Sequence, residues 1–293
     1  MKRLGFVGFG EASFNIAEGL LGENVTGIRA YDVAWKTEPQ AELIKSRAAK
    51  AKVTLDNSLD ELVANSDVVI SSVSANMALP IAVQCVPLLR PDHLYVDLNA
   101  AGPDTKSAIE KELLGHATFV DVAIMGPVPG SGHKVPMVAS GEGAQEFAKF
   151  ANAHGMNVKI VAGPAGSASA SKMVRSIFMK GYVMLLVEAV VAGRKLGIED
   201  EVLASIRDSL TRGEFLQNAN DLMSRGVVHA ERRAHEMDEV IATLKTLGVD
   251  GTMSVATKAK LEWVVKQGFK EYFKGKPPID YHEIFNVLES HNP

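Results

Sequence analysis

Short β-rich runs alternate with helical patterns over the first 125 residues of this chain, and that alternation restricts its fold more than any other sequence feature. Strands that are separated by helices form βαβ units, so the pattern predicts a parallel, doubly wound sheet. The run at 67–73 lacks the in–out alternation of a half-exposed strand, which is typical of a strand buried on both faces. The predicted strands are 3–8, 25–32, 53–55, 67–73, 94–98 and 118–124, and the predicted helices are 12–21, 38–50, 59–64, 75–89 and 104–114.

The sequence changes character after residue 124. Residues 125–132 are rich in glycine and proline and predict a loop. Helical patterns alone follow Gly166, and the first of them, 167–196, is apolar nearly all round from 178 to 192, so we expect it to be buried on most faces. We therefore expect an α/β domain at 1–163 and an all-helical domain at 164–293, led by this long interdomain helix. The remaining predicted strands are 135–139 and 158–161, and the remaining predicted helices are 144–154, 199–211, 214–225, 230–247 and 252–267.

Composition excludes several classes of protein. An apolar fraction of 46% and a charged fraction of 23% are those of an ordinary globular chain, and a net charge of −4 argues against a nucleic-acid binder. The single cysteine, Cys85, excludes an intrachain disulfide, and its apolar surroundings predict a buried packing thiol. No apolar stretch reaches the ~18 residues that a membrane span needs, and Glu188 interrupts the longest apolar region, so we expect no span. The strand pattern at the start and the single cysteine lead us to expect no signal peptide and a cytoplasmic protein.

A glycine-rich turn stands between the first predicted strand and the first predicted helix. Gly8 permits a tight turn, and Gly10 lets the backbone approach a pyrophosphate at the helix N-terminus. Ser13 replaces the third glycine of G-x-G-x-x-G; it is small enough to pack, and its hydroxyl is placed to face a phosphate. We expect the Glu11 carboxylate to point to solvent, because it would repel that phosphate. The predicted cofactor-binding residues of this turn are Gly8, Phe9, Gly10, Glu11, Ala12 and Ser13.

An acidic residue ends the next predicted strand. Asp32 lies 22 residues after Gly10, close to the ~20 expected for a carboxylate that binds ribose hydroxyls. A carboxylate repels a 2′-phosphate, so NAD is the predicted cofactor; the nearby Lys36 weakens that preference and keeps NADP possible. The alternative is a plain strand-turn-helix with an incidental aspartate. With the glycine turn, Asp32 favours a Rossmann-type dinucleotide-binding domain.

Short polar residues follow two later strands. Ser72, Val73 and Ser74 lie at the end of the fourth predicted strand, and Asn99 follows the fifth. Ligands of doubly wound sheets lie beyond the carboxyl ends of the strands, so these residues are predicted to contact the nicotinamide ribose. The alternative is that they are ordinary loop residues.

A polar stripe runs along the otherwise apolar helix predicted at 167–196. Lys172, Ser176 and Lys180 follow one another at intervals of four residues on one face, and Arg175 lies on a neighbouring ridge. A lysine that is partly desolvated near other cations has a lowered pKa, which suits proton transfer near neutral pH. A solvated helix face, or ion pairs to Glu231 or Glu236, is the other interpretation.

At this point the chain resembles the β-hydroxyacid dehydrogenase superfamily, which includes 3-hydroxyisobutyrate and 6-phosphogluconate dehydrogenases. The resemblance is carried by residues 8–10, 72–74, 119–127 and 163–172. It implies an NAD(P)-dependent oxidoreductase that acts on a small, anionic hydroxy acid or related alcohol, with Lys172 as general acid and base, and a homodimer. The later helices resemble a branch of 6-phosphogluconate dehydrogenase-like proteins with an uncharacterised C-terminal domain.

Departures from the superfamily fall on its substrate-binding residues. Met125 stands where the loop D-A-P-V-S-G-G has serine, and Pro127 where it has its second glycine. Arg175 and Ser176 stand in place of the superfamily's asparagine after the lysine. Ala168 replaces the last glycine of the superfamily's lysine motif, G-x-x-G-x-G-x-x-x-K. The substrate identity, and whether decarboxylation accompanies oxidation, stay open. The predicted substrate-binding residues are Met125, Gly126, Pro127, Arg175 and Ser176.

Two other functions remain as alternatives. An imine reductase of the same fold commonly lacks the lysine, so Lys172 speaks against it, and a non-catalytic dinucleotide-binding protein would not need that residue. Arg232, Arg233 and His235 are interpreted either as anion-binding residues or as a surface ion-pair cluster. His133 is interpreted as a loop residue or as a substrate contact. The histidine spacing predicts no metal site.

Overall fold

The computed structural model describes residues 2–291, and the chain divides into two compact units, 1–176 and 177–293. The division falls inside the long helix α7 (Ser167–Leu196), whereas the sequence placed it just before that helix. The first turns of α7 stay with the first unit because Asp121 and Ser140 of the sheet accept hydrogen bonds from their backbone.

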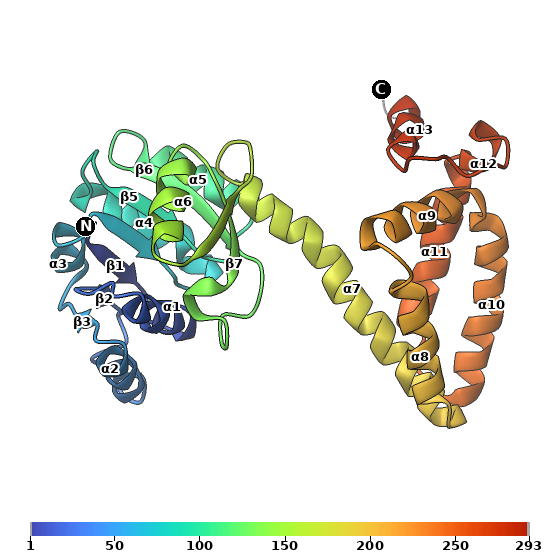
Figure 1. Ribbon diagram of the computed structural model, residues 1–293, viewed down its shortest axis with the longest axis horizontal. Helices are drawn as coiled ribbons and strands as arrows, with labels where there is room; N and C mark the ends of the chain where they lie inside the picture. Colours follow the sequence, from blue (N-terminus) through green and yellow to red (C-terminus); the bar gives the residue numbers. More distant parts are fainter. Residues whose placement is uncertain (1, 292–293) are drawn as a thin grey trace. The chain divides into compact units, whose positions relative to one another are not determined.

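An eight-stranded sheet forms the centre of the first unit (Figure 1). Its strand order is β3-β2-β1-β4-β5-β6-β7-β8, and neighbouring strands are parallel except for β6 and β7. The predicted doubly wound sheet is confirmed; the antiparallel direction of β7 was not predicted. Strand order reverses between β1 and β4, which is where such sheets bind ligands. The strands are β1 (Leu4–Val7), β2 (Arg29–Tyr31), β3 (Thr54–Leu55), β4 (Val68–Ser71), β5 (Leu94–Asp97), β6 (Thr118–Ile124), β7 (Pro136–Ser140) and β8 (Asn157–Ile160).

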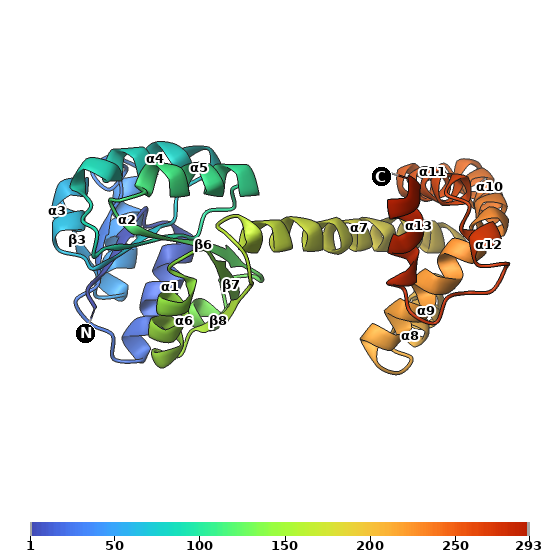
Figure 2. The ribbon, with the colours of Figure 1, turned by 90° about the horizontal axis from the view of Figure 1, so that it is seen from above.

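Helices cover both faces of this sheet. Leu20 and Phe147 belong to the core on one face, and Leu62 and Ile109 to the core on the other. Figure 2 shows α4 and α5 above the sheet, and α1 and α6 below it. The predicted helix 75–89 consists of α4 flanked by two 3-10 turns. The elements are α1 (Glu11–Gly22), α2 (Gln40–Lys50), α3 (Leu59–Ala64), η1 (Ala75–Met77), α4 (Ala78–Cys85), η2 (Val86–Leu88), α5 (Pro103–Leu113), η3 (Gly132–Lys134) and α6 (Ala144–Ala153).

Cys85 is buried under this second face, as predicted. Burial raises the pKa of its thiol to about 12. Its burial in the apolar core confirms the predicted packing thiol, and the raised pKa disfavours the reactive thiolate.

The described part of the second unit is all helical, as predicted. Helices α10 and α11 form a packed pair, and Gly248 ends α10 in the left-handed conformation that glycine favours there. Phe269, Ile284 and Val287 form a small buried core beside them. The helices after α7 are α8 (Glu199–Leu210), α9 (Phe215–Val228), α10 (Ala230–Leu247), α11 (Thr252–Lys266), α12 (Phe269–Tyr272) and α13 (Glu283–His291).

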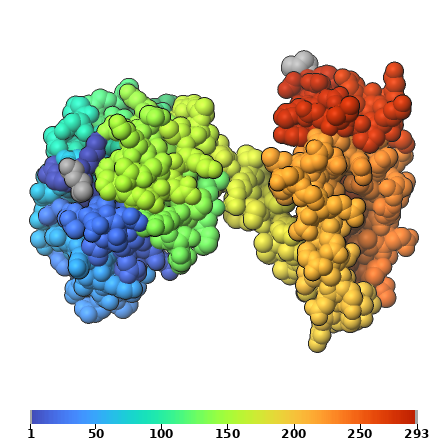
Figure 3. Space-filling model, in the orientation of Figure 1, coloured from blue at the N-terminus to red at the C-terminus, as the bar shows by residue number. Residues whose placement is uncertain are grey.

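The apolar middle of α7 is exposed in the single chain, so the expectation of burial on most faces is wrong for this chain alone. Phe178 is 57% exposed, Val187 51% and Val191 45%. Figure 3 shows this helix, in yellow, at the surface. The pattern was right about the helix, but within residues 2–291 the other helices cover these side chains only in part. The homodimer that the resemblance implies stays a prediction.

By length and composition, α7 could cross a membrane, which corrects the expectation that no apolar stretch is long enough. One such helix is weak evidence for a span, because core helices of soluble proteins pass the same test. Its acidic residue has a structural partner: the Glu188 carboxylate accepts hydrogen bonds from the backbone N–H groups of Met253 and Ser254, and so caps α11.

Arg3 joins the start of β1 to the start of β4. The Arg3 Nη2 lies 2.6 Å from Asp67 Oδ1, and the backbone N–H of Arg3 donates to Asp67 Oδ2 over 2.8 Å. The guanidinium holds the pKa of Asp67 at about 2. A lowered carboxyl pKa contributes stability above the unfolded value of about 4, and that contribution disappears as the pH falls through the folded value.

We predict that Arg3→Gln lowers the free energy of unfolding by about 1 kcal/mol at pH 7, the size typical of a partly exposed pair. The difference from the unsubstituted protein should shrink toward zero near pH 2, where Asp67 becomes protonated. Urea unfolding at the two pH values measures it.

Lys45→Gln is the matched control, because its partner Glu42 is far more exposed and the pair should contribute little. An Arg3→Gln effect of equal size at both pH values would contradict the assignment to Asp67.

Candidate functional site

The turn after β1 admits only glycine at its first position. Gly8 has a φ of +85°, and a Cβ built there would meet the backbone oxygen of Ser72 at 2.4 Å. Its N–H donates to the Tyr31 carbonyl over 2.8 Å. Backbone from β1, β2 and the end of β4 therefore converges at Gly8, the position where the sequence predicted a tight turn.

Gly10 serves a different purpose from Gly8. It precedes α1 with φ −74° and ψ −161°, angles that other residues adopt, and a Cβ there would meet nothing within 4 Å. The first N–H groups of α1 have no partners within the helix, and the helix dipole favours an anion at this end. The bare backbone at Gly10 thus fits a pyrophosphate. Glu11 is exposed, as expected.

The Ser13 hydroxyl does not face a phosphate. It is buried and donates to the Gly8 carbonyl over 2.7 Å, so that expectation is wrong for the side chain. The physical reason is packing: the third position of the fingerprint lies against the strand, where the nearest acceptor is the turn itself. The hydroxyl ties α1 to the glycine turn.

Asp32 holds the two loops that border the site. Its Oδ2 accepts the Phe9 N–H over 2.8 Å, and its Oδ1 accepts the Ala34 N–H over 2.9 Å. Each oxygen keeps a second lone pair for a ribose hydroxyl. Lys36 lies over the Trp35 ring, with Nζ 4.9 Å from the ring centroid.

A cavity of about 400 Å³ opens at the switch point between β1 and β4. It brings together five of the predicted cofactor-binding residues: Gly8, Gly10, Asp32, Val73 and Ser74. Ser72, which the sequence also indicated, lines it as well. The sequence reasoning missed its largely apolar walls, which come from the ends of β1 and β2, from η1 and from α4. The missed lining residues are Val7, Tyr31, Val33, Met77 and Ile81.

Asn99 supports this cavity without lining it. The side chain is buried; its Oδ1 accepts the Val73 N–H over 2.6 Å, and its Nδ2 donates to Ser71 and Asp97. Both amide protons are used inside the protein. Asn99 therefore shapes the Val73 loop instead of offering its amide to the nicotinamide ribose.

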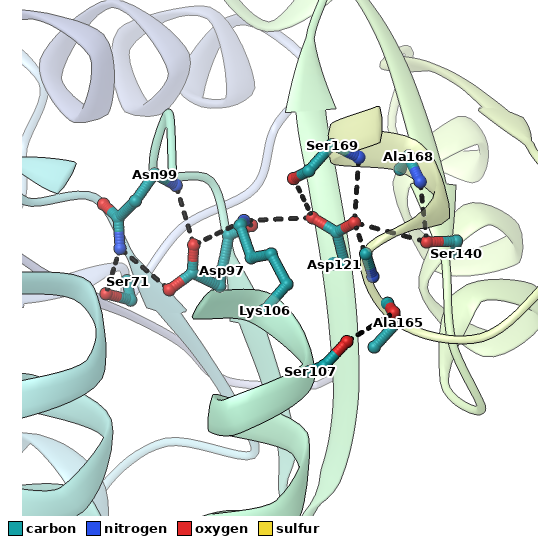
Figure 4. Close-up of polar contacts among 11 residues, drawn as sticks. Ser71, Asp97, Asn99, Lys106, Ser107, Asp121, Ser140, Ala165, Ala168 and Ser169 are labelled. Carbon is teal, nitrogen blue, oxygen red and sulfur yellow. Dashed lines mark hydrogen bonds and ion pairs between the residues drawn. The ribbon is translucent and has the colours of Figure 1, made fainter. Parts of the chain in front are cut away.

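An ionic group that the sequence reasoning missed lies beneath these loops (Figure 4). Lys106 Nζ is 2.7 Å from Asp97 Oδ1 and 3.0 Å from Asp121 Oδ1, and all three side chains are 0% exposed. The available signal was the presence of aspartates inside the apolar strands β5 and β6, because a charge placed there requires a buried partner.

Asp121 also anchors the start of α7. Its Oδ2 accepts the N–H groups of Gly166 and Ser169, over 3.1 and 2.9 Å, and its Oδ1 accepts the Ser169 hydroxyl. The Ser140 hydroxyl on β7 donates to the same carboxylate and accepts the Ala168 N–H. The helix end is thereby capped from the sheet.

Lys172 lies one turn beyond this cap and is half-buried in the first unit. Ser176, one turn further, is also half-buried, and Arg175 is exposed. Met125 and Gly126, directly after β6, are half-buried, and Pro127 is exposed. The predicted substrate residues thus come from two elements anchored on β6.

His133 packs away from the predicted substrate residues. Its buried ring lies against α1, where Gly19 leaves room, and Nε2 is 3.3 Å from a Glu23 oxygen. These contacts favour its interpretation as a loop residue. The largest cause that lowers the pKa of Glu23 is its hydrogen bond from Lys134.

The basic residues of α10 form ion pairs with neighbouring acids. Arg232 pairs with Glu236, and Glu231 pairs with Lys270 on α12. This arrangement favours the surface ion-pair interpretation for Arg232. Within residues 2–291, no group of three or more metal-ligating side chains is assembled.

Comparison with known proteins agrees with this geometry. Residues 3–101 match the family model described as "NADP oxidoreductase coenzyme F420-dependent", and residues 194–264 match a domain of unknown function, DUF1932. The fold and these matches agree with the hydroxyacid dehydrogenase-like superfamily of NAD(P)-dependent oxidoreductases, followed by a C-terminal domain.

The chain belongs to the family of the uncharacterized 28.5 kDa protein encoded in the 7S RNA 5′ region of Methanothermus fervidus. The two are 30% identical over 239 residues, which is 81% of this chain and 89% of the relative. A solved conserved protein of unknown function, described as structurally similar to 3-hydroxyacid dehydrogenases, is 33% identical, with a TM-score of 0.59 over 91% of this chain and 99% of its own. A reductive aminase from Aspergillus terreus in complex with NADPH and ethyl levulinate shares the fold alone, at 19% identity and a TM-score of 0.72 over 97% and 99%.

The two glycines should respond differently to substitution. Gly10→Val should fold normally, because nothing stands near its Cβ, but should weaken NADH binding at least about tenfold by filling the pyrophosphate site. Gly8→Ala should lower the melting temperature, because its Cβ meets backbone in a left-handed conformation. NADH fluorescence titration and thermal unfolding measure the two effects.

Gly22→Ala provides the control, since Gly22 lies at the other end of α1 and its Cβ would also meet nothing within 4 Å. Unchanged NADH affinity in folded Gly10→Val would show that the pyrophosphate does not lie at this turn.

Proposed function

We propose that the protein is an NAD(P)-dependent dehydrogenase that oxidises the CH–OH group of a small, anionic hydroxy acid or related alcohol, with Lys172 as general acid and base. The observation that supports this most is the shared anchoring of the site: Asn99, after β5, holds the Val73 loop of the dinucleotide cavity, and the neighbouring strand β6 fixes the helix of Lys172. The match of residues 3–101 to an NADP oxidoreductase family model agrees with an oxidoreductase.

The dinucleotide would be held by backbone and by Asp32. The N–H groups at the start of α1, left open beside Gly10, would bind the pyrophosphate. The Asp32 carboxylate would accept hydrogen bonds from ribose hydroxyls. Val73 and Ser74 would contact the nicotinamide end, and the apolar residues of the cavity would pack against the adenine.

A bound nicotinamide supplies the hydride acceptor, or in the reverse direction the hydride donor. The Lys172 amine takes the hydroxyl proton as the hydride leaves the carbinol carbon, and the ammonium returns it in the reverse direction. The Arg175 guanidinium attracts the substrate carboxylate, while the Gly126 backbone and the Ser176 hydroxyl orient the carbinol.

Reduction of an imine is the second candidate function. The chain shares its fold with a reductive aminase that was solved in complex with NADPH, and this likeness favours imine reduction. The Lys172 ammonium could protonate an imine nitrogen, but an acid that also acts as a base fits alcohol oxidation better. A panel of hydroxy acids with NAD(P) and a panel of imines with NAD(P)H, followed at the nicotinamide absorbance, separate the two.

Lys172→Met should lower kcat at least about 100-fold, because general acid–base catalysis typically contributes 100- to 10,000-fold. The affinity for NADH should stay within twofold, since methionine keeps the length of the side chain and removes only the amine. Steady-state kinetics and NADH titration measure both.

The matched control is Lys195→Met, which removes an exposed lysine near the other end of the same helix and should leave kcat unchanged. Turnover near the unsubstituted rate in Lys172→Met would refute the catalytic role.

Asp32 should determine the preference for NAD over NADP. We expect Asp32→Ser to raise the affinity for NADPH relative to NADH at least about tenfold, because serine removes the charge that repels a 2′-phosphate but still offers an acceptor to the Phe9 N–H. Titration of both reduced cofactors measures the ratio. Tighter binding of NADPH by the unsubstituted protein would overturn the NAD preference.

A further inference from the structure

Lys106 is a buried cation for which the proposed chemistry has no use. Its ammonium contacts Asp97 and Asp121, and it also donates to the Asp97 carbonyl over 3.0 Å. Two carboxylates and one ammonium leave one net negative charge inside the first unit. Removing these groups from water is costly, so their retention calls for an explanation beyond packing.

One end of this group reaches the dinucleotide cavity. The Asp97 carboxylate accepts both the backbone N–H and the side-chain Nδ2 of Asn99, over 2.9 and 2.8 Å. Asn99 in turn holds the N–H of Val73, which lines the cavity. The orientation of the Val73 loop is therefore fixed from Asp97.

The other end reaches the helix of Lys172. Asp121 binds the first free N–H groups of α7, and the positive end of that helix offsets the excess negative charge. Ser169, whose N–H and hydroxyl both donate to Asp121, stands three residues before Lys172, on the preceding turn. In Figure 4, Lys106 lies between the two carboxylates and bridges them.

We propose that Lys106 is a positioning residue. It locks the end of β5, whose neighbour Asn99 holds the Val73 loop, to Asp121 of β6, which holds the start of α7. It thereby sets where Lys172 stands relative to the nicotinamide side of the cavity. This inference rests on the proposed function for its catalytic consequence. A misplacement of about 1 Å between reacting groups can cost about 100-fold in rate.

A lysine at position 106 suits the positioning of β5 relative to β6 better than an apolar residue would. Ile109 and Leu113 of the same helix α5 supply its packing against the sheet, and both are buried. Apolar contacts of that kind tolerate sliding, whereas hydrogen bonds from one ammonium to two carboxylates fix direction and distance. The bridge therefore fixes the Asp97 and Asp121 carboxylates relative to each other.

The test compares Asp97→Asn with the double variant Asp97→Asn/Lys106→Met. In the single variant, Lys106 still joins the Asp97 carbonyl to the Asp121 carboxylate. The double variant removes that bridge and leaves Asp121 as the buried charge, so it keeps the net charge of −1 of the unsubstituted group. Lys111→Met, an exposed position on α5, is the control for a lysine-to-methionine change.

Two measurements report on the bridge. In the double variant, kcat should fall at least tenfold relative to Asp97→Asn, while KM for the dinucleotide stays within threefold. Hydrogen exchange of the amides at 166–172 should become at least tenfold faster in the double variant only. A role in general stability would not separate kcat from KM in this way.

Equal kcat in the two folded variants, within twofold, would overturn the proposal. If the double variant does not fold, Asp97→Asn/Lys106→Gln replaces it with the same readouts. If the unsubstituted protein turns over neither hydroxy acids nor imines, the proposed function fails, and the exchange comparison still decides whether Lys106 positions α7: unchanged exchange at 166–172 overturns it.

Discussion

The carboxylate of Asp121 is the point on which the arrangement of the first unit depends. It lies within β6, at 0% exposure, and it binds the start of α7 and the ammonium of Lys106 at once. A buried carboxylate is stable only if every lone pair finds a donor, and here backbone N–H groups, two serine hydroxyls and an ammonium provide them. The direction of α7 as it leaves the sheet follows from these bonds, and with it the place of Lys172.

Elements with strong local signals could be predicted from the sequence. The bounds of β6 and of α7 match the predicted 118–124 and 167–196. The first is a continuous β-rich run between turns, and the second contains no proline between Gly166 and Gly197. The antiparallel β7 could not be predicted in this way, since direction depends on how the loop at 125–135 folds back over α1.

The same distinction between local signals and tertiary contacts holds for the site residues. Gly8, Gly10 and Asp32 could be located because backbone geometry and strand ends dictate them, and the cavity brings them together. The Ser13 hydroxyl and the Asn99 amide were placed wrongly, because a pattern gives the residue type but not the partner that a side chain chooses when it is buried. Lys106 escaped notice for a related reason: its position in α5 looks like an ordinary helix face until two strands bring their aspartates beneath it.

In the proposed function, the loop after β6 and the start of α7 would contribute unequally to substrate binding. Methionine at 125 offers no strong hydrogen bond, and proline at 127 has no N–H, so this loop keeps little beyond the Gly126 backbone for an anion. The helix is richer in donors, since Lys172, Arg175 and Ser176 lie within two turns of its cap. A substrate of this protein would thus depend on α7 for its anionic group as well as for its proton transfer. Any force that fixes the first turns of α7 to the sheet then acts on binding and on chemistry together, which gives a buried ionic cap an advantage over an apolar contact of equal stability.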